Sequence, residues 1–107
     1  MDQTLLDAQR RVAAFLTAHG LQAPLAERLL DLVSEVGELA KTALTASDYG
    51  RVPFAVTDAW REELGDVAFS LLSCAVVSEV DLAAALDAAL EKMNRRLTET
   101  GDAASGR

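Results

Sequence analysis

Apolar residues recur at intervals of three and four in four separate segments of this chain, the spacing that places them on one face of an α-helix. The pattern predicts helices over residues 4–19, 24–44, 57–78 and 81–97. Half of the residues are hydrophobic but only 5% are aromatic, which is more typical of closely packed helices than of sheets. We therefore expect an all-α subunit with four helices.

Turn-forming and cap-forming residues separate the four segments. Gly20 follows the first, and a run of polar residues and turn formers at 45–56 separates the second from the third. Thr57 and Asp81 precede the third and fourth, where a side-chain oxygen can accept hydrogen bonds from free backbone N–H groups. The expected buried stripes of the second, third and fourth helices are, respectively, Leu25, Leu29, Leu32, Val36 and Leu39; Trp60, Leu64, Val67, Leu71 and Val76; and Leu82, Leu86, Ala89, Leu90, Met93 and Leu97.

A length of 107 residues fits one domain. We expect residues 1–100 to form a single helical domain and the small, polar residues 101–107 to form a disordered tail. A domain of this size buries a modest fraction of its unfolded surface, so self-association is expected.

The charge of the chain restricts its partners. Seventeen acidic and ten basic residues give a formal net charge of −7, which repels nucleic acid and anionic membranes, so we expect binding to neither. A phosphate substrate then has to arrive with a cation. A single cysteine, Cys74, cannot form an intramolecular disulfide, and neither a spanning apolar run nor a signal-peptide pattern is visible. These features favour a cytoplasmic protein.

Two pairs of acidic residues are the candidates for a metal-binding site. Glu35 and Glu38 are three residues apart in the second predicted helix, and Glu63 and Asp66 are three apart in the third, so each pair lies on nearly one side of its helix. If the two helices pack antiparallel, the four carboxylates converge at one edge of the core and repel one another. A hard divalent cation with oxygen ligands resolves this repulsion, and Mg²⁺ is the natural candidate. The alternative interpretation is that all four residues lie on solvated helix faces, as most Glu and Asp residues do.

The acidic segments resemble a motif pair of a known family. Residues 35–40 (Glu-Val-Gly-Glu-Leu-Ala) and 62–67 (Glu-Glu-Leu-Gly-Asp-Val) resemble the ExxE and ExxD motifs of the MazG-like, all-α NTP pyrophosphatase superfamily. The likeness is closest to the branch that contains dCTP pyrophosphatase. Residues 80–82 and 92–96 resemble the final helix of that branch, so the resemblance extends over residues 25–96.

The resemblance implies a nucleotide pyrophosphohydrolase that converts a (d)NTP and water into the (d)NMP and pyrophosphate, with a house-cleaning role in nucleotide metabolism. It implies that Glu35, Glu38, Glu63 and Asp66 bind Mg²⁺, which Mn²⁺ could replace. A carboxylate of this group that is not a ligand could serve as general base, and Glu38 and Glu63 are the two candidates. We expect a four-helix subunit whose bundle is completed in a homodimer or homotetramer.

Two positions depart from the family pattern. Ser34 stands where some members carry a further glutamate, and residues 41–46 contain no aromatic residue where the dCTP branch places a tryptophan for base stacking. The number of metal ions and the base preference are therefore not carried over. The same departures support an alternative from another class, a non-catalytic helical dimerisation or interaction module that retains the fold.

Candidates for substrate binding lie outside the acidic pairs. Lys92, Asn94, Arg95 and Arg96 could hold the triphosphate, which a net-acidic protein needs. Alternatively, the cations of this group are there because positive charge is favoured near the end of a helix. Trp60 is a candidate platform for the base, with a role in the core or an interface as the alternative.

Overall fold

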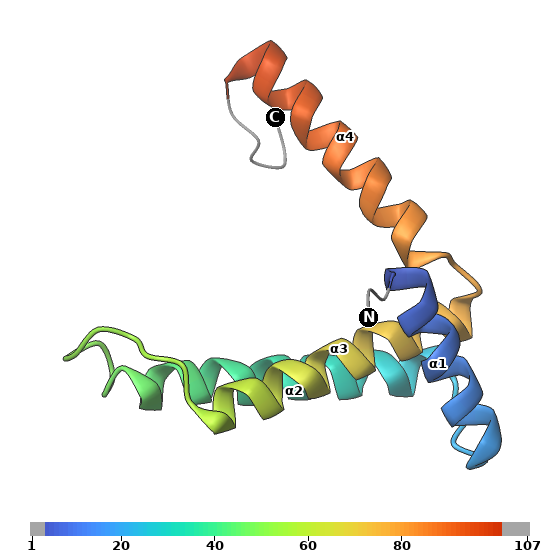
Figure 1. The fold of residues 1–107 in the computed structure, drawn as a ribbon, viewed down its shortest axis with the longest axis horizontal. Helices are drawn as coiled ribbons and strands as arrows, with labels where there is room; N and C mark the ends of the chain where they lie inside the picture. The colour runs from blue at the N-terminus through green and yellow to red at the C-terminus, as the bar shows by residue number, and fades with distance from the viewer. Residues whose placement is uncertain (1–3, 102–107) are drawn as a thin grey trace.

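The computed structural model describes residues 4–101, and these form four α-helices (Figure 1). The helices are α1 (Leu5–Ala18), α2 (Leu25–Ala46), α3 (Asp58–Ser78) and α4 (Leu82–Thr100). No strand occurs in this part of the chain. The predicted all-α class is confirmed, while the tail expected at 101–107 lies outside the described residues except for Gly101.

The predicted starts of α3 and α4 are confirmed by their caps. The side chain of Thr57 accepts a hydrogen bond from the Trp60 backbone N–H at 3.1 Å, and that of Asp81 accepts one from the Ala84 N–H at 3.2 Å. Each bond satisfies one of the backbone donors that a helix start leaves free. The second helix continues two residues beyond the predicted end, to Ala46. The Thr45 hydroxyl in this last turn donates to the Lys41 carbonyl one turn back.

Helices α2 and α3 form an antiparallel hairpin, which is the most extensive helix pair in the structure (Figure 1). Helix α1 packs against the half of α3 that is far from the hairpin loop, and the rings of Phe15 and Phe69 meet edge to face at 5.9 Å. The hairpin is therefore the scaffold on which any site between the two acidic segments is built.

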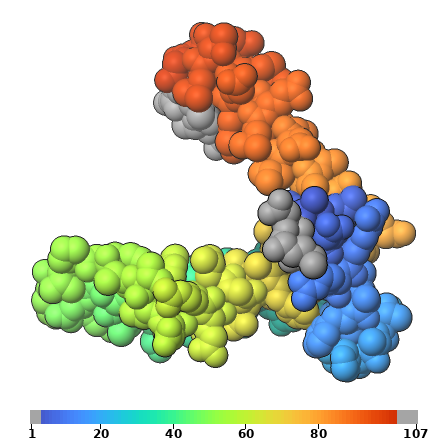
Figure 2. All heavy atoms as spheres, in the orientation of Figure 1, coloured from blue at the N-terminus to red at the C-terminus, as the bar shows by residue number. Residues whose placement is uncertain are grey.

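Helix α4 leaves the hairpin at a sharp angle. Its axis is bent by 103° from that of α3, and Glu79, in the left-handed conformation with φ of 56°, ends α3. Figure 2 shows α4 as a separate arm with open space between it and the hairpin. Its main helix contact is with α1.

One buried side chain fixes this turn. Gln9 of α1 donates from Nε2 to the Val80 carbonyl at 2.8 Å, and its Oε1 accepts from the Leu82 N–H at 2.9 Å. The amide thus satisfies one backbone acceptor and one backbone donor in the turn between α3 and α4. The direction of the α4 arm depends on a contact with α1 rather than on packing against the hairpin.

The subunit has a small core. Its buried hydrophobic residues within 4–101 are Leu16, Leu72, Cys74 and Ala75. In the same range nineteen large hydrophobic side chains are exposed, so much of the expected apolar stripes faces outward. The radius of gyration is 16.6 Å, against about 13 Å for a compact chain of this length.

Among the described residues no single helix is long and apolar enough to cross a membrane, and α3 and α4 meet that criterion only as a bent pair.

Candidate active site

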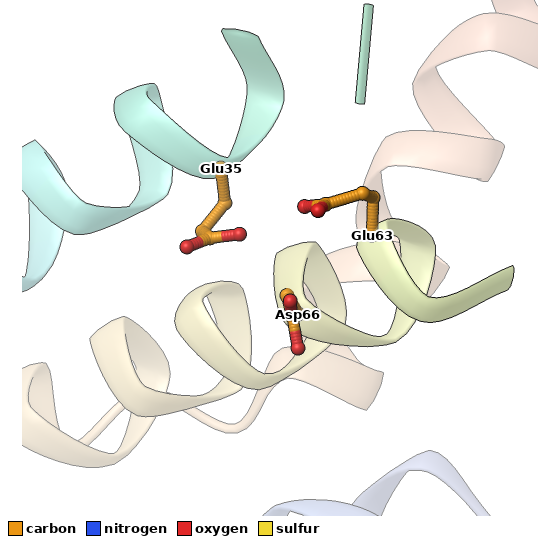
Figure 3. A group of neighbouring side chains, drawn as sticks. All are labelled: Glu35, Glu63 and Asp66. Atoms are coloured by element: carbon orange, nitrogen blue, oxygen red, sulfur yellow. The ribbon is translucent and has the colours of Figure 1, made fainter. Parts of the chain in front are cut away.

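The antiparallel hairpin brings the two acidic segments face to face. Glu35 comes from the middle of α2, and Glu63 and Asp66 come from successive turns of α3 (Figure 3). One carboxylate oxygen from each of the three residues lies within 4.8 Å of the other two. We call these three residues the acidic cluster. Glu35 and Glu63 are half-buried and Asp66 is exposed, so the cluster opens to solvent on one side.

Glu63 is the member least compatible with an ion-free site. Its Oε2 is buried and has no hydrogen-bond partner in the described part of the chain. Burial raises the pKa of the Glu63 carboxyl above its ordinary value of 4.5, and the negative charges of Glu35 and Asp66 raise it further. An unpartnered buried oxygen among three carboxylates is the environment that a divalent cation would stabilise. The residues therefore fit a hard ion such as Mg²⁺.

Glu38, the fourth predicted ligand, lies beside the acidic cluster but outside the group of oxygens within 4.8 Å. It still contributes to the raised pKa of Glu63 through its charge. Glu38 lines a hollow of about 350 Å³ at the loop side of the cluster. The other lining residues of this hollow, which we call the threonine hollow, are Lys41, Thr42, Thr45, Ala46, Thr57 and Ala59.

A second hollow, of about 400 Å³, lies on the opposite side of the acidic cluster along α2. We call it the arginine hollow, and its lining residues are Arg28, Asp31, Glu35, Asp66, Phe69 and Ser70. Two members of the acidic cluster form part of its wall. Glu35 and Asp66 thus border the mostly charged arginine hollow, whereas no member of the acidic cluster lines the threonine hollow.

Arg28 was missed by the sequence analysis, although a signal for it exists. It precedes Glu35 by seven residues, which on an α-helix is a rotation of about 20° from the same face. The arginine therefore belongs to the same side of α2 as the first acidic motif. A spacing of seven beside a predicted metal site could have identified it.

Trp60 lies in a different hollow from the acidic cluster. Its ring meets that of Phe54 edge to face at 5.2 Å, and both line a hollow of about 710 Å³ with α2 residues. This hollow shares no lining residue with the threonine hollow or the arginine hollow. Within one subunit, Trp60 is not brought together with the acidic cluster.

The basic run of α4 is also separate from the acidic cluster in one subunit. Lys92, Asn94 and Arg95 are exposed and Arg96 is half-buried, and all four lie on the arm that projects from the hairpin (Figures 1 and 2). The arm has no substantial contact with α2 among the described residues. These side chains can approach an acidic cluster only if the arm moves or a second subunit supplies them.

Cys74 is inert in its surroundings. It is a free, buried thiol, and burial raises its pKa, which lowers its thiolate fraction at neutral pH. It is not among the lining residues of the threonine hollow or the arginine hollow.

Comparison with known proteins agrees with the geometry of the hairpin. Residues 25–100 match the family described as the MazG nucleotide pyrophosphohydrolase domain. This match covers α2, α3 and α4, and thus every residue of the acidic cluster and of both hollows. No curated protein and no solved structure matches the chain. The chain belongs to the MazG nucleotide pyrophosphohydrolase family.

Proposed function

We propose that this protein hydrolyses a nucleoside or deoxynucleoside triphosphate to the monophosphate and pyrophosphate in a Mg²⁺-dependent reaction. The single observation that carries the proposal is the acidic cluster, in which three carboxylates lie within 4.8 Å of one another around a buried oxygen without a partner. Membership of a nucleotide pyrophosphohydrolase family supports this reaction class. In this proposal the protein acts in the cytoplasm and binds a nucleotide as its substrate. It binds neither nucleic acid nor a membrane.

The carboxylates take different parts in this proposal. Glu35, Glu63 and Asp66 would hold the ion, because their oxygens are the ones that lie together. Bound Mg²⁺ would supply charge neutralisation for phosphate oxygens and a lowered pKa for an attacking water. Glu38 is the favoured general base, because it borders the site without belonging to the group of three, and its exposed carboxylate can accept a proton from water.

The active unit in this proposal is a homodimer, or a homotetramer built from dimers. The exposed leucines and methionine of α4 occur at positions 86, 90, 93 and 97, which share one helix face. A second subunit would cover this stripe. It would also offer a route by which Lys92, Asn94, Arg95 and Arg96 reach the phosphates of a substrate held at an acidic cluster.

The direct test is pyrophosphate release from a panel of canonical and modified NTPs and dNTPs, with and without Mg²⁺ or Mn²⁺. We expect turnover of at least one nucleotide only with the ion. Glu38→Ala and Asp66→Ala should each lower kcat by at least about 100-fold, a range typical of lost general-base or metal-ligand groups. The matched control is Glu62→Ala, which removes a neighbouring exposed acid whose position is about 100° around α3 from Glu63.

Circular dichroism of each variant checks that helicity is retained. A non-catalytic interaction module would give no turnover with any nucleotide and no stabilisation by Mg²⁺. That result would overturn the proposal.

A further inference from the structure

Arg28, near the start of α2, has a mostly buried side chain whose hydrogen-bond donors are used incompletely. The side chain is 12% exposed, and its Nη1 lies 3.8 Å from an Asp31 carboxylate oxygen, beyond hydrogen-bond length. Nη2 donates to the Leu21 carbonyl. Nε is buried with no acceptor among residues 4–101. A guanidinium is a fork of several N–H donors, and that of Arg28 has donors left for a ligand.

Ser70 of α3 offers a second donor in the arginine hollow. The residue is 6% exposed and lines the hollow together with Arg28. Its hydroxyl takes part in no hydrogen bond within the described residues. The hydroxyl of a buried residue and a mostly buried guanidinium with an unpartnered Nε therefore border the same space, from two different helices.

The remaining charges of the arginine hollow define what can enter it. Asp31, Glu35 and Asp66 repel a free anion, and Arg28 repels a free cation. A divalent cation carrying a phosphate satisfies both requirements, because the ion faces the carboxylates while its phosphate oxygens accept from guanidinium and hydroxyl groups. A carboxylate ligand or an uncharged base would satisfy only part of this lining.

We propose that Arg28 and Ser70 bind the pyrophosphate part of the nucleoside triphosphate, and hence the pyrophosphate product, on the arginine side of the acidic cluster. The nucleoside part then extends toward the threonine hollow, which is lined by three threonines and two alanines besides the opposite charges of Glu38 and Lys41. This inference rests on the proposed function, and it assigns substrate orientation to residues of the hairpin itself.

A purely structural role for Arg28 makes different predictions. Arg28 ties the loop before α2 to the helix through Leu21 and neutralises part of the charge of Asp31. Loss of that role would lower the melting temperature without changing the relative affinities for two products. A binding role changes the affinity for pyrophosphate and leaves that for the nucleoside monophosphate unchanged.

The experiment is isothermal titration of the full chain with Mg²⁺ alone, then with inorganic pyrophosphate or a nucleoside monophosphate in the presence of Mg²⁺. Arg28→Met should weaken pyrophosphate binding about 10- to 100-fold, the range for a lost charged hydrogen bond. Affinity for Mg²⁺ alone should be unchanged or tighter, because a neighbouring positive charge is removed. Affinity for the monophosphate should stay within about twofold of wild type.

Three further variants complete the design. Ser70→Ala should weaken pyrophosphate binding about threefold, and Arg28→Lys should give an intermediate loss, because an ammonium keeps the charge but not the planar fork. If Arg28→Met does not fold, pyrophosphate binding by Ser70→Ala and Arg28→Lys still tests the inference. The matched control is Arg61→Met, which removes an arginine with the same i,i+3 pairing to an aspartate, outside the hollow, and should leave pyrophosphate affinity unchanged.

The inference and the proposed function fail in distinguishable ways. Wild-type protein that binds no Mg²⁺ and hydrolyses no nucleotide would overturn the proposed function. Active wild-type protein whose folded Arg28 and Ser70 variants keep normal pyrophosphate affinity would overturn only the inference. If those variants lose monophosphate binding and keep pyrophosphate binding, the nucleotide lies in the opposite orientation in the site. That result would also overturn the inference.

Discussion

Glu63 is a half-buried carboxylate with three acidic neighbours. At the scale of single residues, burial and these negative charges both disfavour its ionised form, so Glu63 is the group expected to make the stability of the site depend on pH. Glu35 and Glu38 face it from α2 and Asp66 faces it from its own helix. Because the pKa of Glu63 is raised, the folded protein holds this proton more tightly than the unfolded chain does. Its contribution to stability is therefore present below pH 4.5 and is lost as the pH rises through the raised value.

This sign gives a prediction for Glu63→Gln. Without divalent ions, the variant should lose less stability than wild type when the pH rises from 4 to 7, because the amide cannot ionise. Added Mg²⁺ should raise the melting temperature of wild type by about 5 °C at pH 7, at roughly ten times its Kd. It should have little effect at pH 4, where protons compete with the ion.

Thermal melts followed by circular dichroism check this prediction, with Glu62→Gln as the exposed control. Identical pH profiles for wild type and Glu63→Gln would show that the buried carboxylate does not control the response.

Gln9 gives a second prediction at the residue scale. Gln9→Ala removes the partners of the Val80 carbonyl and the Leu82 N–H at once, so we expect a loss of about 2 kcal/mol in the free energy of unfolding. The measurement is urea denaturation at fixed protein concentration, with the exposed Gln22→Ala as control, for which the expected change is below about 0.5 kcal/mol. A loss equal to that of the control would mean that the α3–α4 turn does not need this amide.

At the scale of elements, the local features were predictable and the long-range ones were not. The caps at Thr57 and Asp81 depend on residues three positions apart, and such short patterns are visible in a sequence. The meeting of Glu35 with Glu63 needed one further assumption, that the two helices pack antiparallel. The direction of α4 depends on Gln9, which is more than seventy residues away in sequence from the α3–α4 turn that it contacts. The helical spacing of apolar residues does not predict such a long-range hydrogen bond.

Helix α3 shows why the expected buried stripe was only partly right. Leu64 and Leu71 are 46% and 41% exposed, whereas Ser73 and Cys74 are buried. The helix packs against α2 and α1 at once, so its small residues enter the contacts and some larger apolar ones remain outside. A single stripe assumes a single neighbour, and α3 has two.

At the scale of the whole molecule, the subunit exposes more apolar surface than a stable monomer usually does. Its radius of gyration exceeds the compact value by several ångströms, and the α4 stripe of Leu86, Leu90, Met93 and Leu97 is about half exposed. The arm also carries three cations, Lys92, Arg95 and Arg96, in addition to Arg28 and Lys41 in the hollows of the hairpin. Both features are accounted for if two subunits exchange contacts through their arms.

Leu90→Asp tests this arrangement. In a symmetric dimer the substitution occurs twice, and losing about 1.5 kcal/mol or more of apolar burial at each copy should weaken dimerisation on the order of 100-fold. Sedimentation velocity across a dilution series should then show monomer at concentrations where wild type is dimeric. The control is Ala88→Asp, about 200° around α4 from Leu90, which should keep the dimer.

Mg²⁺ binding, which uses α2 and α3 of one subunit, should survive in the Leu90→Asp monomer while hydrolysis falls, because the cations of a second arm no longer reach the substrate. A wild type that remains monomeric and active at every concentration would contradict the assembly, and the hairpin alone would then have to account for catalysis.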